Sequence, residues 1–315
     1  MGRFEQATGF LTPELQSKLL LLPDKIKENA QEIRLRTGRA AIVECGMERF
    51  FLTESGGQTK VKQTGLFIMS AQLLSECFAR LCNYSQHAYQ TEIKSGYITV
   101  QGGHRVGFCG SAVCTDGSIS GIRNLSGMNI RIARQAKGVA EKTAQKLLFG
   151  STSGLLVAGA PSSGKTTFIR DLARILSDEK KLAVIDQRGE IAGVYQAAAQ
   201  NDFGVHCDIL DGYPKPEGIE IATRVLSPEI IVCDEIGGSD EAKAILQAVH
   251  AGVTIMATVH AGSVEELLKK QHIRQLLEAS VFENIVFLSA RPVPCTVTET
   301  ISSSALLEKT ERRYD

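Results

Sequence analysis

The stretch "LLVAGAPSSGKTTFIRDLARIL", residues 155–176, decides how the second half of this chain folds. Its first residues form an apolar run typical of a buried β-strand. A glycine-flanked loop ending in Gly-Lys-Thr-Thr follows, and the apolar residues after the loop recur at helical spacing. This order of strand, loop and helix predicts a cradle for phosphate groups.

The loop matches the phosphate-binding pattern G-x-x-x-x-G-K-[ST]. Glycines let backbone N–H groups crowd around phosphate oxygens, and the following helix turns its positive N-terminal end to the same anion. We expect Lys165 to contact the β- and γ-phosphates of ATP, Thr166 to ligate Mg²⁺, and Thr167 to lie near the α-phosphate. The expected nucleotide-binding residues are Gly159, Ala160, Pro161, Ser162, Ser163, Gly164, Lys165, Thr166 and Thr167.

A second acidic element follows in "PEIIVCDEIG", residues 228–237. Four apolar strand residues deliver Asp234 and Glu235 to the carboxyl end of the sheet, beside the phosphate loop. Asp234 is expected to hold the Mg²⁺ shell, and Glu235 to polarise an attacking water. Two consecutive acids favour hydrolysis over transfer to a bound acceptor.

Two more strand ends point to the same edge. "TIMATVHAG", residues 254–262, brings Thr258 and His260 there, and we expect His260 to sense the γ-phosphate by hydrogen bonding. "KLAVIDQRGEIAG", residues 181–193, supplies acids and an arginine that either tune the metal site or form a salt-bridge network. The Pro-rich "DILDGYPKPEG", residues 208–218, predicts a turn-rich loop, and its composition assigns it no chemistry.

The 315 residues, 43% of them apolar, suffice for two domains with buried cores. Residues 1–138 mix short helices and strands, which predicts an α+β domain. We assign 139–153 to a linker, 154–290 to the ATPase domain and 291–315 to a C-terminal tail. In the ATPase domain apolar strands alternate with helices, which predicts a mostly parallel sheet with crossover helices. Together with the phosphate loop, we expect an α/β fold of the RecA/AAA-like P-loop NTPase class.

Composition also bounds the cellular setting. No apolar run approaches the roughly 20 residues of a membrane-spanning helix, and the N-terminus lacks a secretory pattern. Eight cysteines are scattered without a Cys-x-x-Cys pair, which suits a reducing compartment and gives little support for zinc. We therefore expect a cytoplasmic protein.

Charge is balanced overall but unevenly divided. Residues 1–138 hold 17 Lys and Arg against 11 Asp and Glu, and the remainder holds 18 against 24. A modestly basic half is compatible with nucleic acid or anionic lipid. Because the excess is small and not clustered, we favour a solvated surface with a few anion-contacting arginines and expect no nucleic-acid partner.

A set of motifs resembles the stage III sporulation protein AA family, ring-forming ATPases related to type II and type IV secretion motors. In chain order, between about residues 30 and 290, the blocks are "EIRLRTGRA", "GYITVQGGHRVGF", "NIRIARQ", "GAPSSGKTT", "VIDQRGEIAG", "DILDGYPKPEG", "SPEIIVCDEIG" and "ATVHAG". The resemblance implies a hexamer with nucleotide between subunits. It also implies a role in powering or assembling a channel between mother cell and forespore, from the mother-cell cytoplasm and through membrane proteins of that channel.

The resemblance also assigns residues. Asp186 occupies the place of an acidic strand end between the two nucleotide motifs, which implies an accessory metal ligand, and His260 occupies that of a His box. Arginines of the N-terminal domain would reach the γ-phosphate as catalytic groups. The candidates are Arg105, Arg131 and Arg134, with Arg123 weaker.

Two positions depart from the family pattern. Gln187 stands where a glutamate is usual, which leaves the metal role of the preceding acid open. Gly238 stands where an arginine often follows the second acidic element, which weakens a charged contact there.

Three functions compete. The leading one is an Mg²⁺-ATP-dependent ring motor for secretion or channel assembly. A nucleic-acid-binding ATPase is the second, although the chain shows no aromatic-basic recognition motif. A small-molecule kinase is the third, and it would need an acceptor pocket and a lid.

Overall fold

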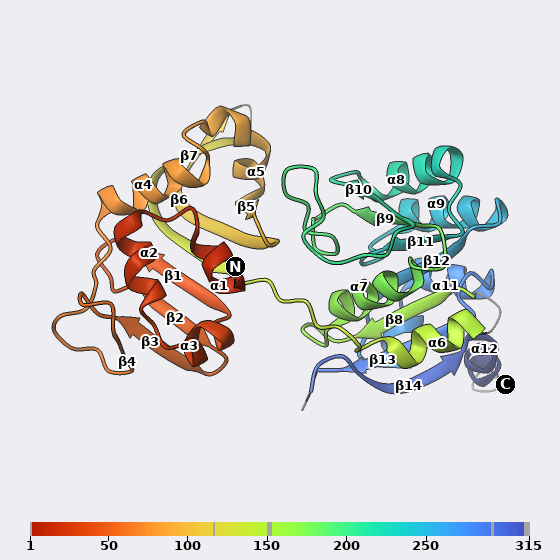
Figure 1. The fold of residues 1–315 in the computed structure, drawn as a ribbon. Helices are drawn as coiled ribbons and strands as arrows, with labels where there is room; N and C mark the ends of the chain where they lie inside the picture. Colours follow the sequence, from red (N-terminus) through yellow and green to blue (C-terminus); the bar gives the residue numbers. More distant parts are fainter. Residues whose placement is uncertain (1, 116, 150–152, 291–292, 312–315) are drawn as a thin grey trace. The chain divides into compact units, whose positions relative to one another are not determined.

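The computed structural model describes residues 2–115, 117–149, 153–290 and 293–311, and the chain forms two units (Figure 1). The first unit comprises Met1–Arg134 together with Gly193–Gln200, and the second comprises Gln135–Ala192 and Asn201–Asp315. The sequence pattern predicts that the first domain ends at residue 138. No local sequence signal marked the short segment that the second half contributes to the first unit.

The first unit combines a seven-stranded antiparallel sheet with short helices. The strands, in sheet order, are β4 (Gln58–Thr59), β3 (Glu48–Leu52), β2 (Ile42–Cys45), β1 (Glu32–Arg36), β7 (Ser118–Arg131), β6 (His104–Thr115) and β5 (Tyr97–Val100). The helices are α1 (Arg3–Thr8), α2 (Pro13–Leu20), α3 (Asp24–Asn29), α4 (Ala71–Leu81), the 3-10 turn η1 (Gln86–Tyr89) and α5 (Gln90–Ser95). This is the α+β organisation that the sequence predicts.

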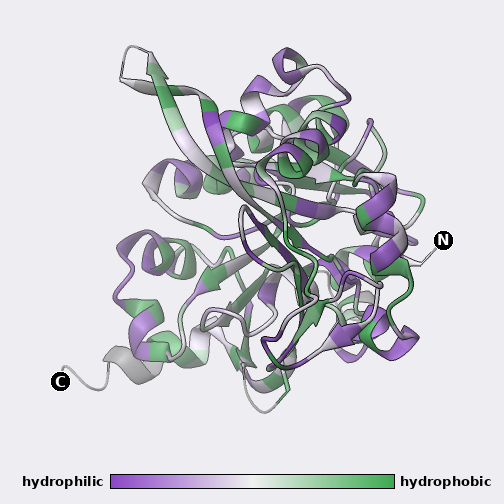
Figure 2. Cartoon of the chain, turned by 90° about the vertical axis from the view of Figure 1, so that its left-hand side faces the viewer, coloured by the Kyte–Doolittle hydropathy of each residue, from purple (hydrophilic) through white to green (hydrophobic). Residues whose placement is uncertain are grey.

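The longest helix of this unit, α4, begins and packs as its sequence directs. The Ser70 hydroxyl accepts a hydrogen bond from the Leu73 N–H at 3.0 Å and so caps the helix. Leu74, Cys77 and Phe78 lie on one face and are buried in the core. On the sheet, β6 and β7 continue past their other neighbours as a two-stranded ribbon (Figure 2).

The second unit is built on a mostly parallel sheet. Its strands, in sheet order, are β10 (Cys207–Asp211), β9 (Leu182–Asp186), β11 (Ile230–Cys233), β12 (Thr254–His260), β8 (Leu155–Gly159), β13 (Asn284–Ser289) and β14 (Thr296–Ser302). Every neighbouring pair is parallel except β13 with β14. The predicted parallel α/β sheet is therefore confirmed.

Helices cover both faces of this sheet, which is why β8, β9 and β11 are buried along their whole length. Leu155 and Val157 belong to the core with α6 and α7, and Leu156 and Ala158 belong to the core on the opposite face. The helices are α6 (Glu141–Phe149), α7 (Lys165–Leu176), α8 (Lys215–Ile221), the π-helical turn η2 (Ala222–Leu226), α9 (Ser239–His250), α10 (Val264–Leu268), α11 (Gln271–Glu278) and α12 (Ser303–Glu311).

Helix α6 occupies much of 139–153, the segment assigned to a linker. Ala140, just before this helix, and Ala144 and Leu147 within it pack into the core. Much of the expected tail, 291–315, is ordered as β14 and α12. β14 pairs with β13, and Leu306 on α12 is only 2% exposed.

Within the described ranges, no helix is both long enough and apolar enough to cross a lipid bilayer.

Candidate functional site

The phosphate loop joins β8 to α7, and its glycines are required by both backbone and space. Gly164 precedes the helix with a φ of 89°, a conformation that L-residues rarely adopt. A Cβ atom at Gly164 would overlap the Cys295 thiol, and one at Gly159 would overlap the Ser163 hydroxyl. That hydroxyl is buried and has no hydrogen-bond partner within the described part of the chain.

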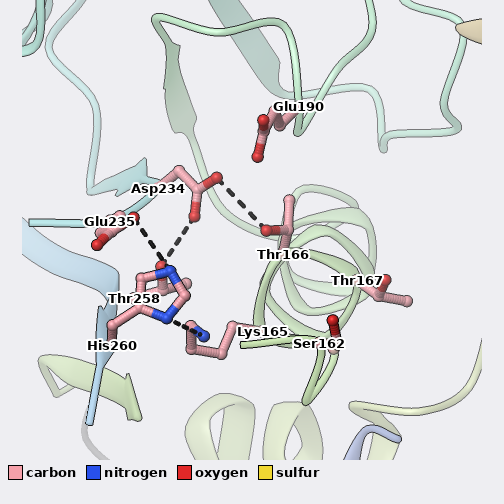
Figure 3. A pocket seen from close by; sticks show the side chains of 10 residues that line it. Ser162, Lys165, Thr166, Thr167, Glu190, Asp234, Glu235, Thr258 and His260 are labelled. Atoms are coloured by element: carbon pink, nitrogen blue, oxygen red, sulfur yellow. Dashed lines mark hydrogen bonds and ion pairs between the residues drawn. The ribbon is translucent and has the colours of Figure 1, made fainter. Parts of the chain in front are cut away.

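A pocket opens at this loop, at the carboxyl edge of the parallel strands (Figure 3). The residues that line it come from the loop, from α7, from the ends of β11 and β12, and from the segment after β9. They are Ser162, Gly164, Lys165, Thr166, Thr167, Glu190, Asp234, Glu235, Thr258 and His260. The adjacency of β11, β12 and β8 thus brings the separated sequence motifs together.

Asp234 is held between two threonines. Thr258 Oγ1, buried on β12, donates a hydrogen bond to Asp234 Oδ1 at 2.8 Å, and Thr166 Oγ1 lies 3.4 Å from Oδ2 (Figure 3). A threonine hydroxyl beside a carboxylate offers the hard oxygen ligands that Mg²⁺ prefers.

Lys165 is bound by its own loop. Its side chain is nearly buried, and Nζ donates to the carbonyl oxygens of Gly159 at 2.9 Å and Ala160 at 3.1 Å. Burial lowers the pKa of Lys165, and the nearby carboxylates of Glu235 and Asp234 oppose that shift. A phosphate entering the pocket would give this ammonium group an anion in place of two neutral carbonyl groups.

His260 connects the lysine to the second carboxylate. Its Nδ1 lies 2.9 Å from Lys165 Nζ, and its Nε2 lies 3.3 Å from Glu235 Oε2 (Figure 3). Because an ammonium group only donates, Nδ1 must accept, so the ring proton lies on Nε2 and faces Glu235. The segment after β11 is fixed to β12, since the Ile236 N–H donates to the Thr258 carbonyl oxygen at 3.0 Å.

Comparison with known proteins assigns the family. The sequence profile described as "Sporulation stage III, protein AA" matches residues 3–304. The chain belongs to this family. It is similar to "Stage III sporulation protein AA" of Bacillus subtilis (strain 168), with 34% identity over 295 residues and 92% of each chain covered. The resemblance predicted from the motifs is thereby confirmed.

Solved structures similar to this member of the sporulation stage III AA family support the fold. The pilus retraction motor PilT with bound ADP superimposes with a TM-score of 0.61 at 15% identity, covering 92% of this chain and 87% of that one. The Legionella pneumophila ATPase DotB gives a TM-score of 0.56 at 15% identity, covering 88% and 76%. At this identity the likeness concerns the fold.

Asp186, expected as a metal ligand from the family resemblance, does not line the pocket. Its carboxylate is 1% exposed and accepts three backbone N–H bonds, from Glu190 at 2.8 Å, Ile191 at 3.1 Å and Ala192 at 2.7 Å. Asp186 instead shapes the turn after β9 that places Glu190 in the pocket. In the sequence, an aspartate at a strand end followed three residues later by a glycine is typical of such a turn. In the structure Gly189 adopts the left-handed conformation that the turn requires.

Replacement of Asp186 by asparagine is expected to cost stability, because the amide NH₂ would face buried N–H donors. We expect the free energy of unfolding in urea to fall by about 1–3 kcal/mol, with the Mg²⁺ dependence of nucleotide binding little changed. Asp202→Asn, at an exposed carboxylate, is the control. A raised Mg²⁺ requirement without loss of stability would instead show that Asp186 acts on the metal.

The three leading candidate arginines and the weaker Arg123 belong to the first unit, whereas the residues that line the pocket belong to the second. The Arg105 guanidinium lies 4.7 Å from the centroid of the Tyr97 ring. Arg131 Nε lies 3.8 Å from Glu32 Oε2, and Arg134 donates to the Ala30 carbonyl oxygen at 2.9 Å. Arg105 and Arg131 are direct cross-strand partners on β6 and β7, so two like charges lie opposite each other.

Proposed function

We propose that this chain is an Mg²⁺-ATP-hydrolysing subunit of a hexameric ring. The ring would power or assemble a channel between mother cell and forespore, from the mother-cell cytoplasm and attached through the channel's membrane proteins. One observation carries the enzymatic part: Lys165, Thr166, Asp234, Glu235 and His260 converge on one pocket beside the phosphate loop. Family membership supports the sporulation role.

The residues of the pocket fit a nucleoside triphosphate with its metal. Gly159 and Gly164 keep side-chain bulk out of the loop. Among the described residues the Ser163 hydroxyl has no hydrogen-bond partner, and a bound anion or a rearranged loop would supply one. Thr166 and Asp234 would hold Mg²⁺. When bound there, the metal would supply positive charge that offsets the negative charge developing on the phosphate oxygens.

The other pocket residues would bind the phosphates and activate the attacking water. Lys165 would exchange its loop carbonyls for phosphate oxygens, and in doing so it would leave His260 Nδ1. Glu235 would accept a proton from an attacking water, and the His260 Nε2–H would keep that carboxylate oriented. His260 thus links phosphate binding by the lysine to the carboxylate that activates water.

The ring is proposed from the fold and from the arginines. PilT is a motor with bound ADP and DotB is an ATPase, and this chain shares their fold. Arg105 and Arg131 lie directly opposite each other on β6 and β7, so one bound anion would contact both guanidinium groups. An arginine supplied by a neighbouring subunit is worth about 10³ to 10⁵ in rate.

A mixing experiment tests the arginines. Arg131→Ala protein and Glu235→Gln protein are each expected to be inactive, but in mixed rings an intact pocket can face an intact arginine. We therefore expect a fraction of ATP hydrolysis to return at intermediate mixing ratios. No recovery at any ratio, with ring assembly intact by light scattering, would contradict an arginine acting across subunits.

The proposed function as a whole is tested by phosphate release and by sizing. Purified protein should release phosphate from ATP only with Mg²⁺, and a nonhydrolysable ATP analogue should shift it towards a hexamer in light scattering. Absence of Mg²⁺-dependent phosphate release in every oligomeric state would refute it.

A further inference from the structure

The Pro-rich segment 208–218, whose composition indicates no chemistry, contains a buried cation. Lys215 is the first residue of α8 and is 9% exposed. A buried ammonium group is costly unless it is paired, and the free N–H groups at the start of a helix repel it further. The location of Lys215 therefore requires partners that compensate both costs.

Those partners surround the proposed catalytic glutamate. Lys215 Nζ donates a hydrogen bond to the main-chain carbonyl oxygen of Glu235 and lies 3.4 Å from Oε1 of Glu241 on α9. The other oxygen of Glu241, Oε2, accepts the N–H of Gly237 at 2.7 Å. We call Lys215 and Glu241 the clamp, because together they hold the backbone on both sides of Ile236.

The clamp completes the fixation of a short turn. The N–H of Ile236, between the two clamped residues, donates to the Thr258 carbonyl oxygen at 3.0 Å. Backbone groups of Glu235, Ile236 and Gly237 thus each have a partner on another element. The Glu235 side chain leaves this turn and meets His260 Nε2 at 3.3 Å.

The helix that carries Lys215 is itself set close to the sheet. A Cβ atom at Gly218 would lie 2.7 Å from Ile185 Cγ2, so the glycine lets α8 approach β9. Pro214 and Pro216 on either side of Lys215 restrict the backbone where the helix begins. The two prolines and the glycine of this segment therefore fix the position of Lys215.

We propose that Lys215 is a positioning residue for Glu235 in ATP hydrolysis, an inference that rests on the proposed function. Lys215 is not among the residues that line the pocket, so it acts through the backbone of Glu235. A displacement of about 1 Å at a reacting group lowers a rate by about 10²-fold. Loss of the clamp should therefore lower kcat and leave nucleotide affinity unchanged.

The test is Lys215→Met, which keeps most of the length of the side chain and removes its charge and donors. We expect kcat for ATP to fall by about 10- to 100-fold, with KM and the affinity for a nonhydrolysable analogue within about threefold of wild type. The matched control is Lys243→Met, at an exposed lysine of α9 whose nearest acid is Asp240 at 3.1 Å. That variant should match wild type in both constants.

Two further variants separate positioning from folding. Glu241→Gln weakens the clamp from the other side and should lower kcat in the same direction, even if Lys215→Met fails to fold. Added to Glu235→Gln, the Lys215→Met change should slow residual hydrolysis no further, because no carboxylate is left to position. A structural defect would slow it again.

Three results would overturn the inference: an unchanged kcat in both clamp variants, a raised KM with kcat intact, or an additive loss with Glu235→Gln. If the wild-type protein hydrolyses no ATP, the proposed function itself fails, and the role of the clamp fails with it.

Discussion

Glu235→Gln is expected to lower steady-state ATP hydrolysis by about 10² to 10⁴-fold and to leave ATP binding intact. Glutamine keeps the size of the side chain and an oxygen that can accept from His260 Nε2, which lies 3.3 Å from the carboxylate. It cannot take a proton from water. Bound ATP should therefore accumulate on the protein. Gel filtration measures it as intact nucleotide that co-elutes with the protein, and phosphate release measures the rate of hydrolysis.

The control for this variant is Glu220→Gln, at an exposed carboxylate paired with Arg224 at 3.5 Å. It should hydrolyse ATP at the wild-type rate. Steady-state turnover in Glu235→Gln equal to wild type would show that another group activates the water, and Glu190, which also lines the pocket, would be the first to test.

Lys165→Ala is expected to weaken Mg²⁺-ATP binding by about 10- to 100-fold and to abolish measurable turnover. A hydrogen bond to a charged group contributes about 1.5–3 kcal/mol, and each 1.4 kcal/mol is about tenfold in affinity. We expect the affinity for nucleotide to fall, because the alanine variant has no ammonium group to donate to the phosphates. Without nucleotide, Lys165 Nζ contacts only its own loop carbonyls and His260 among the described residues. Titration with a fluorescent ATP analogue measures the affinity.

Lys180→Ala serves as the matched variant, since Lys180 is a more exposed lysine that pairs with Glu229 at 2.9 Å. Its affinity for the analogue should equal that of wild type. If Lys165→Ala retained wild-type affinity, the phosphate loop would not be the principal anion site, and the nucleotide reading of the pocket would have to be abandoned.

The sequence predicts those parts of the site that follow from the succession of elements along the chain. A buried strand, a glycine loop and a helix in succession predict where Lys165 and Thr166 lie relative to each other. Parallel strands end at one edge, so the acids after β11 and the histidine that ends β12 were expected beside the loop, and the pocket contains them. Strand order confirms this reasoning, because β11, β12 and β8 are consecutive neighbours.

The features that the sequence does not predict depend on contacts formed only in the folded chain. The location of Asp186 at a strand end resembles that of Asp234, but three N–H groups of its own turn occupy its carboxylate. Lys215 looked like one more residue of a turn-rich loop, and only the packing of α8 on β9 brings it to the Glu235 backbone. β14 pairs with a buried strand although its own side chains are mostly exposed, so composition did not reveal it.

A crystal structure with Mg²⁺ and a nonhydrolysable ATP analogue tests the central claim most directly. We expect the triphosphate against the loop between Gly159 and Thr166, the metal beside Thr166 and Asp234, and Lys165 Nζ turned from the Gly159 and Ala160 carbonyls to phosphate oxygens. A structure at saturating analogue in which the loop is empty and Lys165 keeps its carbonyl partners would contradict the account.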